Sequence, residues 1–134
     1  MKRGEVWWVE FDPSVGSEIK KTRPAVIVSN DAANRNLARV VVVPLTSNTG
    51  RAYPGEAVVT IAGQASKAMA DQIMAADKAR LKTQLGSLTK TDMLAVEDAI
   101  KVAATGNVGD LLGGMGKDMA MGAVLDGVTK KRKK

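Results

Sequence analysis

The chain has 134 residues, the length of a single domain, and 45% of them are hydrophobic, so we expect one folded core. It contains no cysteine and no histidine, which excludes disulfides, thiol nucleophiles, thiolate metal sites and the commonest general acid–base. A net charge of +6 favours a polyanionic partner, either nucleic acid or an acidic protein, although ordinary solubility charge explains it equally well. No apolar run reaches the ~18 residues of a membrane span, and the N-terminus lacks a signal-peptide core, so we expect a cytoplasmic protein without a membrane partner.

The N-terminal part of the chain predicts strands separated by polar loops. β-branched and aromatic residues indicate a strand over Glu5–Phe11, and a long loop rich in turn residues follows over Asp12–Thr22. A short apolar run predicts a central strand over Ala25–Ser29, with Pro24 at its first position, where a strand needs no hydrogen-bond donor. The polar stretch over Asn30–Asn36 predicts a turn or a single helical turn.

Three further strands are predicted before the C-terminal helix. Arg39–Thr46 reads as a buried strand in which Pro44 indicates a bulge or a sheet edge, and a turn-rich loop follows over Ser47–Gly55. Glu56–Ile61 predicts another strand. Around Met69–Ala75 weak alternation also favours a strand, although the alanines there favour a helix.

The segment 88–104 predicts a helix that closes a small curved sheet. Thr89 followed by Asp92 resembles a capping box. One apolar face follows, made of Met93, Val96, Ile100 and Ala103. We therefore expect a mainly β domain with one helix over residues 1–104. The Gly- and Met-rich residues 105–134, with their basic end, predict a flexible or weakly helical tail that is passive or tethers RNA nonspecifically.

Two motifs could carry chemistry. Pro24 restricts Arg23 to an extended conformation at the rim of the sheet, where its planar fork suits a phosphate, although pairing with Glu18 or Asp12 would explain it structurally. Small polar side chains follow the strand that ends at Thr46 and suit an oxyanion or phosphate cradle, although such residues are also common in turns. Polar Asp71 and Gln72 lie among apolar residues and need hydrogen-bond partners or a site to serve.

Five blocks in the first 104 residues resemble the MazF/PemK toxins, the sequence-specific endoribonucleases of toxin–antitoxin modules. The blocks are RGEVWWVEFDPSVGSE, TRPAVIVSND, VVVPLTSN, YPGEAVV and ADQIMAADKARL. The resemblance implies a CcdB/PemK-like fold, which is an SH3-like barrel with a C-terminal helix. It also implies cleavage of single-stranded RNA without metal or other cofactor, in which the ribose 2′-OH attacks the adjacent phosphate to leave a 2′,3′-cyclic phosphate and a 5′-OH.

The resemblance assigns Arg23 and Thr46 as catalytic residues. The expected substrate-binding residues are Ser17, Glu18, Lys20, Lys21, Ser47, Asn48, Arg51, Asp71 and Gln72. The chain departs from the PemK pattern at two positions. Met69 stands where PemK toxins have the arginine that acts as the general acid, and Ser17 stands where they have the histidine of the oxyanion site. Met74 also stands where many relatives have an arginine, which removes an RNA contact. These departures favour MazF-type chemistry through Arg23 and Thr46.

The resemblance further implies three partners: single-stranded RNA, a second copy of the chain in a homodimer, and an acidic antitoxin of the MazE type. The same fold leaves two alternatives open. The chain could be a non-catalytic SH3-like binding module, or it could poison a protein target such as DNA gyrase in the manner of CcdB. The presence of both Arg23 and Thr46 favours the enzyme.

Overall fold

A computed structural model of the chain describes residues 1–11 and 21–106. Its strands are β1 (Glu5–Phe11), β2 (Lys21–Ile27), β3 (Arg39–Thr46), β4 (Glu56–Ile61), β5 (Gln64–Met69), β6 (Met74–Asp77) and β7 (Leu81–Ser87). Its helices are α1 (Asp31–Asn36) and α2 (Lys90–Thr105), with short 3-10 turns η1 (Ala70–Gln72) and η2 (Lys78–Arg80). The strands predicted over Glu5–Phe11, Arg39–Thr46 and Glu56–Ile61 are confirmed.

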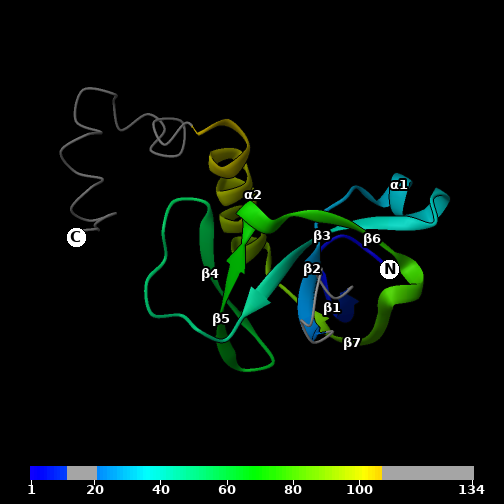
Figure 1. Cartoon of the computed structure of the whole chain (residues 1–134), viewed down its shortest axis with the longest axis horizontal. Helices are drawn as coiled ribbons and strands as arrows, with labels where there is room; N and C mark the ends of the chain where they lie inside the picture. Colours follow the sequence, from blue (N-terminus) through cyan, green and yellow to red (C-terminus); the bar gives the residue numbers. More distant parts are fainter. Residues whose placement is uncertain (12–20, 107–134) are drawn as a thin grey trace, which may run out of the picture.

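The strands of the described residues form one antiparallel sheet in the order β4-β5-β3-β2-β1-β7, and β6 pairs with the first half of β3. Figure 1 shows the sheet strongly curved, with α2 beside β4 and β5 and with α1 at the far side, next to β3 and β6. This arrangement confirms the predicted mainly β fold of the SH3-like barrel type with a C-terminal helix. The curvature does not close the hydrogen-bonded ring, because no described ladder joins β4 to β7.

The curved sheet buries apolar residues on both of its faces. The first core contains Val6, Val26, Val43, Leu45, Val59 and Ile61, and α2 covers it with Met93, Val96 and Ala99. The second core contains Val9, Ala25, Ile27, Val40, Val42, Ala76 and Leu81. Strands β1, β2 and β3 contribute to both cores, which explains why β2 and β3 contain the continuous apolar runs of residues 25–27 and 40–43. Each fully buried valine contributes roughly 1.5–3 kcal/mol of stability.

Helix α2 begins and ends with well-formed caps. The Thr89 hydroxyl accepts a hydrogen bond from the backbone N–H of Asp92 at 3.1 Å, as the capping-box pattern predicts. The helix ends at Gly106, whose φ of 70° places it in the left-handed region that glycine favours. Asp92 also accepts a hydrogen bond from the backbone N–H of Thr60 on the outer edge of β4, at 2.9 Å. The helix is thus fixed to β4 by a polar contact as well as by its apolar face.

The predicted apolar face of α2 is partly confirmed. Met93 and Val96 are buried and Ile100 is partly buried against the first core. Ala103 is exposed, whereas Ala99 and Val102 are buried. The buried stripe therefore includes positions i+3 and i+6 from Val96, and it ends one residue before Ala103.

The prediction that Pro24 begins a strand is wrong. Strand β2 starts at Lys21, so Pro24 lies in its middle and pairs with Trp8 of β1. The pairing of β2 with β3 begins only at Ala25. Pro24 is tolerated because the ladder between β2 and β3 does not reach it, so the missing N–H removes no hydrogen bond to β3.

Pro44 lies in a central strand, so the expectation of a sheet edge is wrong. Strand β3 pairs with β6 up to Val42 and with β5 from Leu45, and Pro44 lies between these two ladders. Because β3 changes partner at this point, proline costs no hydrogen bond on that side. The opposite side of β3 pairs Pro44 with Ala25.

The strand predicted around Met69–Ala75 is wrong. Strand β5 ends at Met69, η1 reverses the chain over Ala70–Gln72, and β6 begins at Met74. Asp71 and Gln72 thus lie in an exposed turn and not in the middle of a strand. The turn leads the chain from β5, which pairs with the C-terminal end of β3, to β6, which pairs with the N-terminal half of β3.

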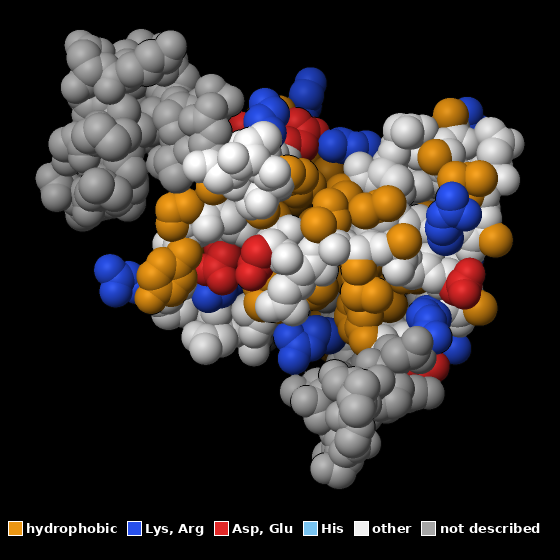
Figure 2. Space-filling view, turned by 45° about the horizontal axis from the view of Figure 1, so that its top comes forward, with side chains coloured by type: hydrophobic (Ala, Val, Ile, Leu, Met, Phe, Trp, Pro, Cys, Tyr) orange, Lys and Arg blue, Asp and Glu red, His pale blue; other side chains and the backbone are white. Residues whose placement is uncertain are grey.

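The surface of the described residues carries scattered charge. On the face in Figure 2, Lys and Arg side chains are distributed around the surface and hydrophobic side chains lie between them. Among the described residues no helix is long and apolar enough to cross a membrane. The tail predicted over 105–134 lies outside the described residues beyond Gly106, as does most of the predicted loop over Asp12–Thr22.

Candidate functional site

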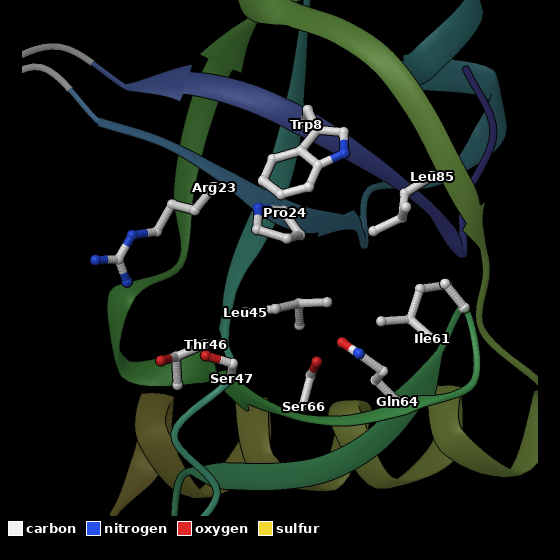
Figure 3. A pocket seen from close by; sticks show the side chains of 11 residues that line it. Trp8, Arg23, Pro24, Leu45, Thr46, Ser47, Ile61, Gln64, Ser66 and Leu85 are labelled. Atoms are coloured by element: carbon white, nitrogen blue, oxygen red, sulfur yellow. The ribbon is translucent and has the colours of Figure 1, made fainter.

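A pocket of about 530 Å³ lies between the β1–β2 pair and the β4–β5 hairpin. It is lined by Trp8, Arg23, Pro24, Leu45, Thr46, Ser47, Ile61, Ala62, Gln64, Ser66 and Leu85. Figure 3 shows Trp8 and Pro24 on one wall and Gln64 and Ser66 on the opposite wall. The pocket shares Leu45 and Ile61 with the first core, so its floor is part of the rigid sheet.

The predicted catalytic residues Arg23 and Thr46 both line this pocket, together with Ser47. In Figure 3 the guanidinium of Arg23 extends away from Pro24, on the side of the pocket where Thr46 and Ser47 lie. Arg23 is partly exposed, and within the described residues its guanidinium has no hydrogen bond or ion pair. Its planar group of N–H donors is of the kind that binds a phosphate.

The end of β3 orients the Thr46 hydroxyl. Its Oγ1 accepts a hydrogen bond from the backbone N–H of Asn48 at 3.3 Å. The Asn48 side chain in turn accepts one from the N–H of Gly50 at 3.2 Å, which shapes the loop. With one lone pair engaged, Thr46 can direct its hydroxyl hydrogen toward a ligand oxygen.

An ion pair anchors the loop that follows Ser47. Lys67 pairs with Thr46 in the β5–β3 register, and its Nζ lies 3.3 Å from the Glu56 carboxylate and 3.0 Å from the carbonyl oxygen of Arg51. Glu56 also accepts a hydrogen bond from the N–H of Tyr53 at 2.9 Å. The side chains of Lys67 and Glu56 are only 12% and 18% exposed. This anchor fixes both ends of the 47–55 loop beside the pocket.

Four of the other predicted binding residues, Asn48, Arg51, Asp71 and Gln72, are described and do not line the pocket. The Arg51 guanidinium lies 5.3 Å from the ring centroid of Tyr53, which is a cation–π contact on the loop. Asp71 is exposed in η1, where Gln72 contacts the Met69 sulfur at 3.5 Å. Asn48 shapes the loop, and Lys21 is the first residue of β2. Ser17, Glu18 and Lys20 lie outside the described residues.

Sequence reasoning missed Trp8, Gln64 and Ser66 as pocket residues. The hairpin β4–β5 pairs Ile61 with Gln64 across a two-residue turn, and both turn residues, Ala62 and Gly63, have positive φ (53° and 79°). This turn is typical of a tight hairpin and sets the register that directs residues 64 and 66 to the pocket side. A strand predicted over residues 64–69 would have placed the side chains of Gln64 and Ser66 on the same face of the sheet.

The described residues of the site carry no carboxylate. Asp and Glu are absent from the pocket lining, so its only ionised side chain is Arg23. Among residues 1–11 and 21–106, no three His, Cys, Asp or Glu side chains gather as potential metal ligands. The described lining thus combines one cationic side chain with apolar side chains such as Trp8 and Leu85.

Comparisons with known proteins place the chain in a family. Residues 2–104 match the family described as PemK-like, MazF-like toxin of type II toxin–antitoxin system. The chain belongs to this family. Among curated relatives, the endoribonuclease MazF9 of Mycobacterium tuberculosis is 36% identical over 76% of this chain and 94% of its own length. The endoribonuclease toxin MazF of Escherichia coli is 33% identical over 74% of this chain and 89% of its own length.

Solved structures of MazF-type toxins share the fold. An endoribonuclease from a mycobacterial species, solved in complex with its cognate antitoxin, superposes with a TM-score of 0.65 at 31% identity. The match covers 78% of this chain and 94% of that one. The family resemblance stated from five sequence blocks is therefore confirmed, and the pocket is the candidate active site of a MazF/PemK toxin.

Proposed function

We propose that the chain is a toxin endoribonuclease that cleaves single-stranded RNA at the pocket. The observation that carries this proposal is the convergence of Arg23, Thr46 and Ser47 at the rim of one pocket in a MazF/PemK chain. The ribose 2′-oxygen gives its proton to solvent water and attacks the adjacent phosphorus. The bond from phosphorus to the 5′-oxygen breaks, and that oxygen takes up a proton from solvent water. The products are a 2′,3′-cyclic phosphate and a 5′-OH.

The roles of the described residues follow from their chemistry. The guanidinium of Arg23 neutralises the charge that develops on the non-bridging phosphate oxygens. Thr46 and Ser47 donate hydroxyl hydrogens to the same oxygens. We assign to these three residues the stabilisation of the transition state. The MazF-type mechanism, without metal, agrees with the loss of the PemK arginine at Met69.

Replacing Arg23 tests the proposal. Arg23→Ala should reduce cleavage by about 10²–10³-fold, the usual cost of losing one oxyanion donor, and Arg23→Lys should rescue little because it lacks the planar fork. Arg39→Ala is a matched control, because it removes the same charge at the other end of β3 from Thr46, where Arg39 lies opposite Asp77 in the ladder with β6. The measurement is the rate of cleavage of a single-stranded RNA in EDTA, with cyclic-phosphate ends identified by mass spectrometry.

Equal rates for wild type and Arg23→Ala would reject the role of Arg23. Products with 5′-phosphate ends would reject the reaction. RNA binding without cleavage would favour the non-catalytic module, and inhibition of DNA gyrase without cleavage would favour the CcdB-like alternative.

The same proposal includes two protein partners. An acidic antitoxin is supported by the structural relatives, of which the mycobacterial toxin and the MazF of Deinococcus radiodurans are both solved with their antitoxins. A homodimer would extend the small RNA-binding surface of one sheet. Sedimentation of the purified chain tests the dimer, and competition between RNA and the cognate antitoxin tests whether both occupy the Arg23 side of the pocket.

A further inference from the structure

The Ser66 hydroxyl has no explanation in the fold. Ser66 and Asn34 are the two buried polar residues among the described part of the chain, and Ser66 is 9% exposed. Asn34 is satisfied, because its side chain hydrogen-bonds to Ser29 and Asp31. Within the described residues the Ser66 hydroxyl has no hydrogen bond, although nearly all buried polar groups in proteins have one. Its partner in the ladder is the apolar Val59, so packing alone would accept alanine at this position.

The Ser66 hydroxyl and the Gln64 amide lie on the same wall of the pocket. The two residues are separated by one position in β5, so they point to the same face of the sheet. Figure 3 shows both side chains directed into the pocket. The Gln64 side chain likewise has no hydrogen bond within the described residues. Together they present a hydroxyl and an amide, which can each donate and accept.

The opposite wall is flat and apolar. Trp8 is 37% exposed, which is unusual for so large an apolar group, and its ladder partner Pro24 lies next to it. Leu85 of β7 continues this wall. An indole that remains open toward a pocket is a stacking surface for a nucleobase. The pocket volume of about 530 Å³ falls in the range of about 300–1,000 Å³ that bound small molecules fill.

We propose that this pocket is a nucleobase subsite that gives the enzyme base selectivity. The base next to the cleaved phosphate stacks on Trp8, and Ser66 and Gln64 hydrogen-bond to its edge. The phosphate of the same nucleotide then lies at the rim beside Arg23. The inference rests on the proposed function in one respect, namely that the ligand is RNA. It assigns selectivity to residues that take no part in the phosphate chemistry.

The first test measures binding without cleavage. The chain contains two tryptophans, and Trp7 contributes to the second core and donates to Glu5, so Trp7→Phe leaves Trp8 as the only reporter in the pocket. Short single-stranded oligodeoxynucleotides of each of the four bases lack the 2′-OH and cannot be cut. We expect them to quench Trp8 fluorescence, with affinities that differ among the bases. Trp8→Ala, followed by anisotropy of a labelled oligonucleotide, should weaken binding about 5- to 150-fold, as loss of one stacked base does.

The second test separates base reading from general affinity. Ser66→Ala and Gln64→Ala should each reduce the preference for the best base over the others by about 2- to 12-fold, the value of one hydrogen bond. Ser87→Ala is the control, because Ser87 is an exposed serine of β7 outside the pocket. An unchanged base preference in both pocket variants, or an equal loss of affinity for all four bases, would overturn the inference. The Ser66 hydroxyl would then have a water molecule as its hydrogen-bond partner.

The outcomes distinguish this inference from the proposed function. Base-selective quenching by a chain that cuts no RNA would reject the ribonuclease and keep the subsite. RNA cleavage by a chain whose Trp8 fluorescence does not respond to any oligonucleotide would keep the ribonuclease and reject the subsite.

Discussion

Lys67→Met should destabilise the fold far more than an ordinary surface ion pair would. The Lys67 and Glu56 side chains are largely shielded from water, and the Nζ also hydrogen-bonds to the Arg51 carbonyl oxygen. Breaking a fully buried pair costs about 3–5 kcal/mol, because one charge remains uncompensated. Here Glu56 keeps its hydrogen bond from Tyr53, so we expect a loss of about 2–3 kcal/mol in the free energy of unfolding.

Urea denaturation followed by circular dichroism measures this loss. Lys82→Met is the matched control, since Lys82 pairs with Glu10 at 3.8 Å through side chains that are 51% and 36% exposed. That variant should lose at most about 1 kcal/mol. Adding Glu56→Gln to Lys67→Met should restore part of the stability, because it removes the stranded charge. If Lys67→Met costs no more than Lys82→Met, the shielding of this ion pair does not matter and the reasoning is wrong.

Three further predictions concern the helix cap, the pocket wall and acid stability. Thr89→Ala removes the acceptor of the Asp92 N–H and should cost about 1 kcal/mol in urea denaturation, whereas Thr89→Ser should cost little. A Cβ at Gly86 would lie 2.9 Å from the Ile61 Cδ1, so Gly86→Ala should turn Ile61 within the pocket and slow RNA cleavage while changing the melting temperature by only a few degrees. A hydrogen bond from the backbone N–H of Arg3 lowers the pKa of Asp31 below its usual value. Its contribution to stability is therefore present at neutral pH and is lost as the pH falls through the lowered pKa, and Asp31→Asn should flatten the acid limb of stability against pH.

Local patterns predicted the elements whose sequence agrees with their environment. The strand over Glu5–Phe11 and the capped helix after Thr89 carry both propensity and pattern, and the structure confirms them. Strand β7 was missed because Leu81 is its only buried residue and the rest of LKTQLGS is largely polar. The segment Met69–Ala75 was misread because its turn and the two short flanking strands are set by their partners on β3 and not by local preference.

The predicted site was found in part for a similar reason. Arg23 and Thr46 were expected from motif resemblance, and the fold brings both to one pocket. Trp8 and Ser66 belong to opposite walls that meet only when the β4–β5 hairpin folds over the β1–β2 pair. No periodicity within either strand contains this contact, because it depends on the curvature of the whole sheet.

The hydrogen bond from Thr60 to Asp92 has a consequence for assembly. Strand β4 is an outer strand of the sheet, and an unpaired N–H on such a strand is a template for another chain to add a strand. Asp92 occupies that donor, and the carboxylate would repel the carbonyl oxygen of an approaching backbone. The start of α2 thus disfavours the pairing of another chain with the outer edge of β4. A protein that adds a strand to β4 would first have to displace the start of α2, whereas this contact does not cover β7, the other outer strand.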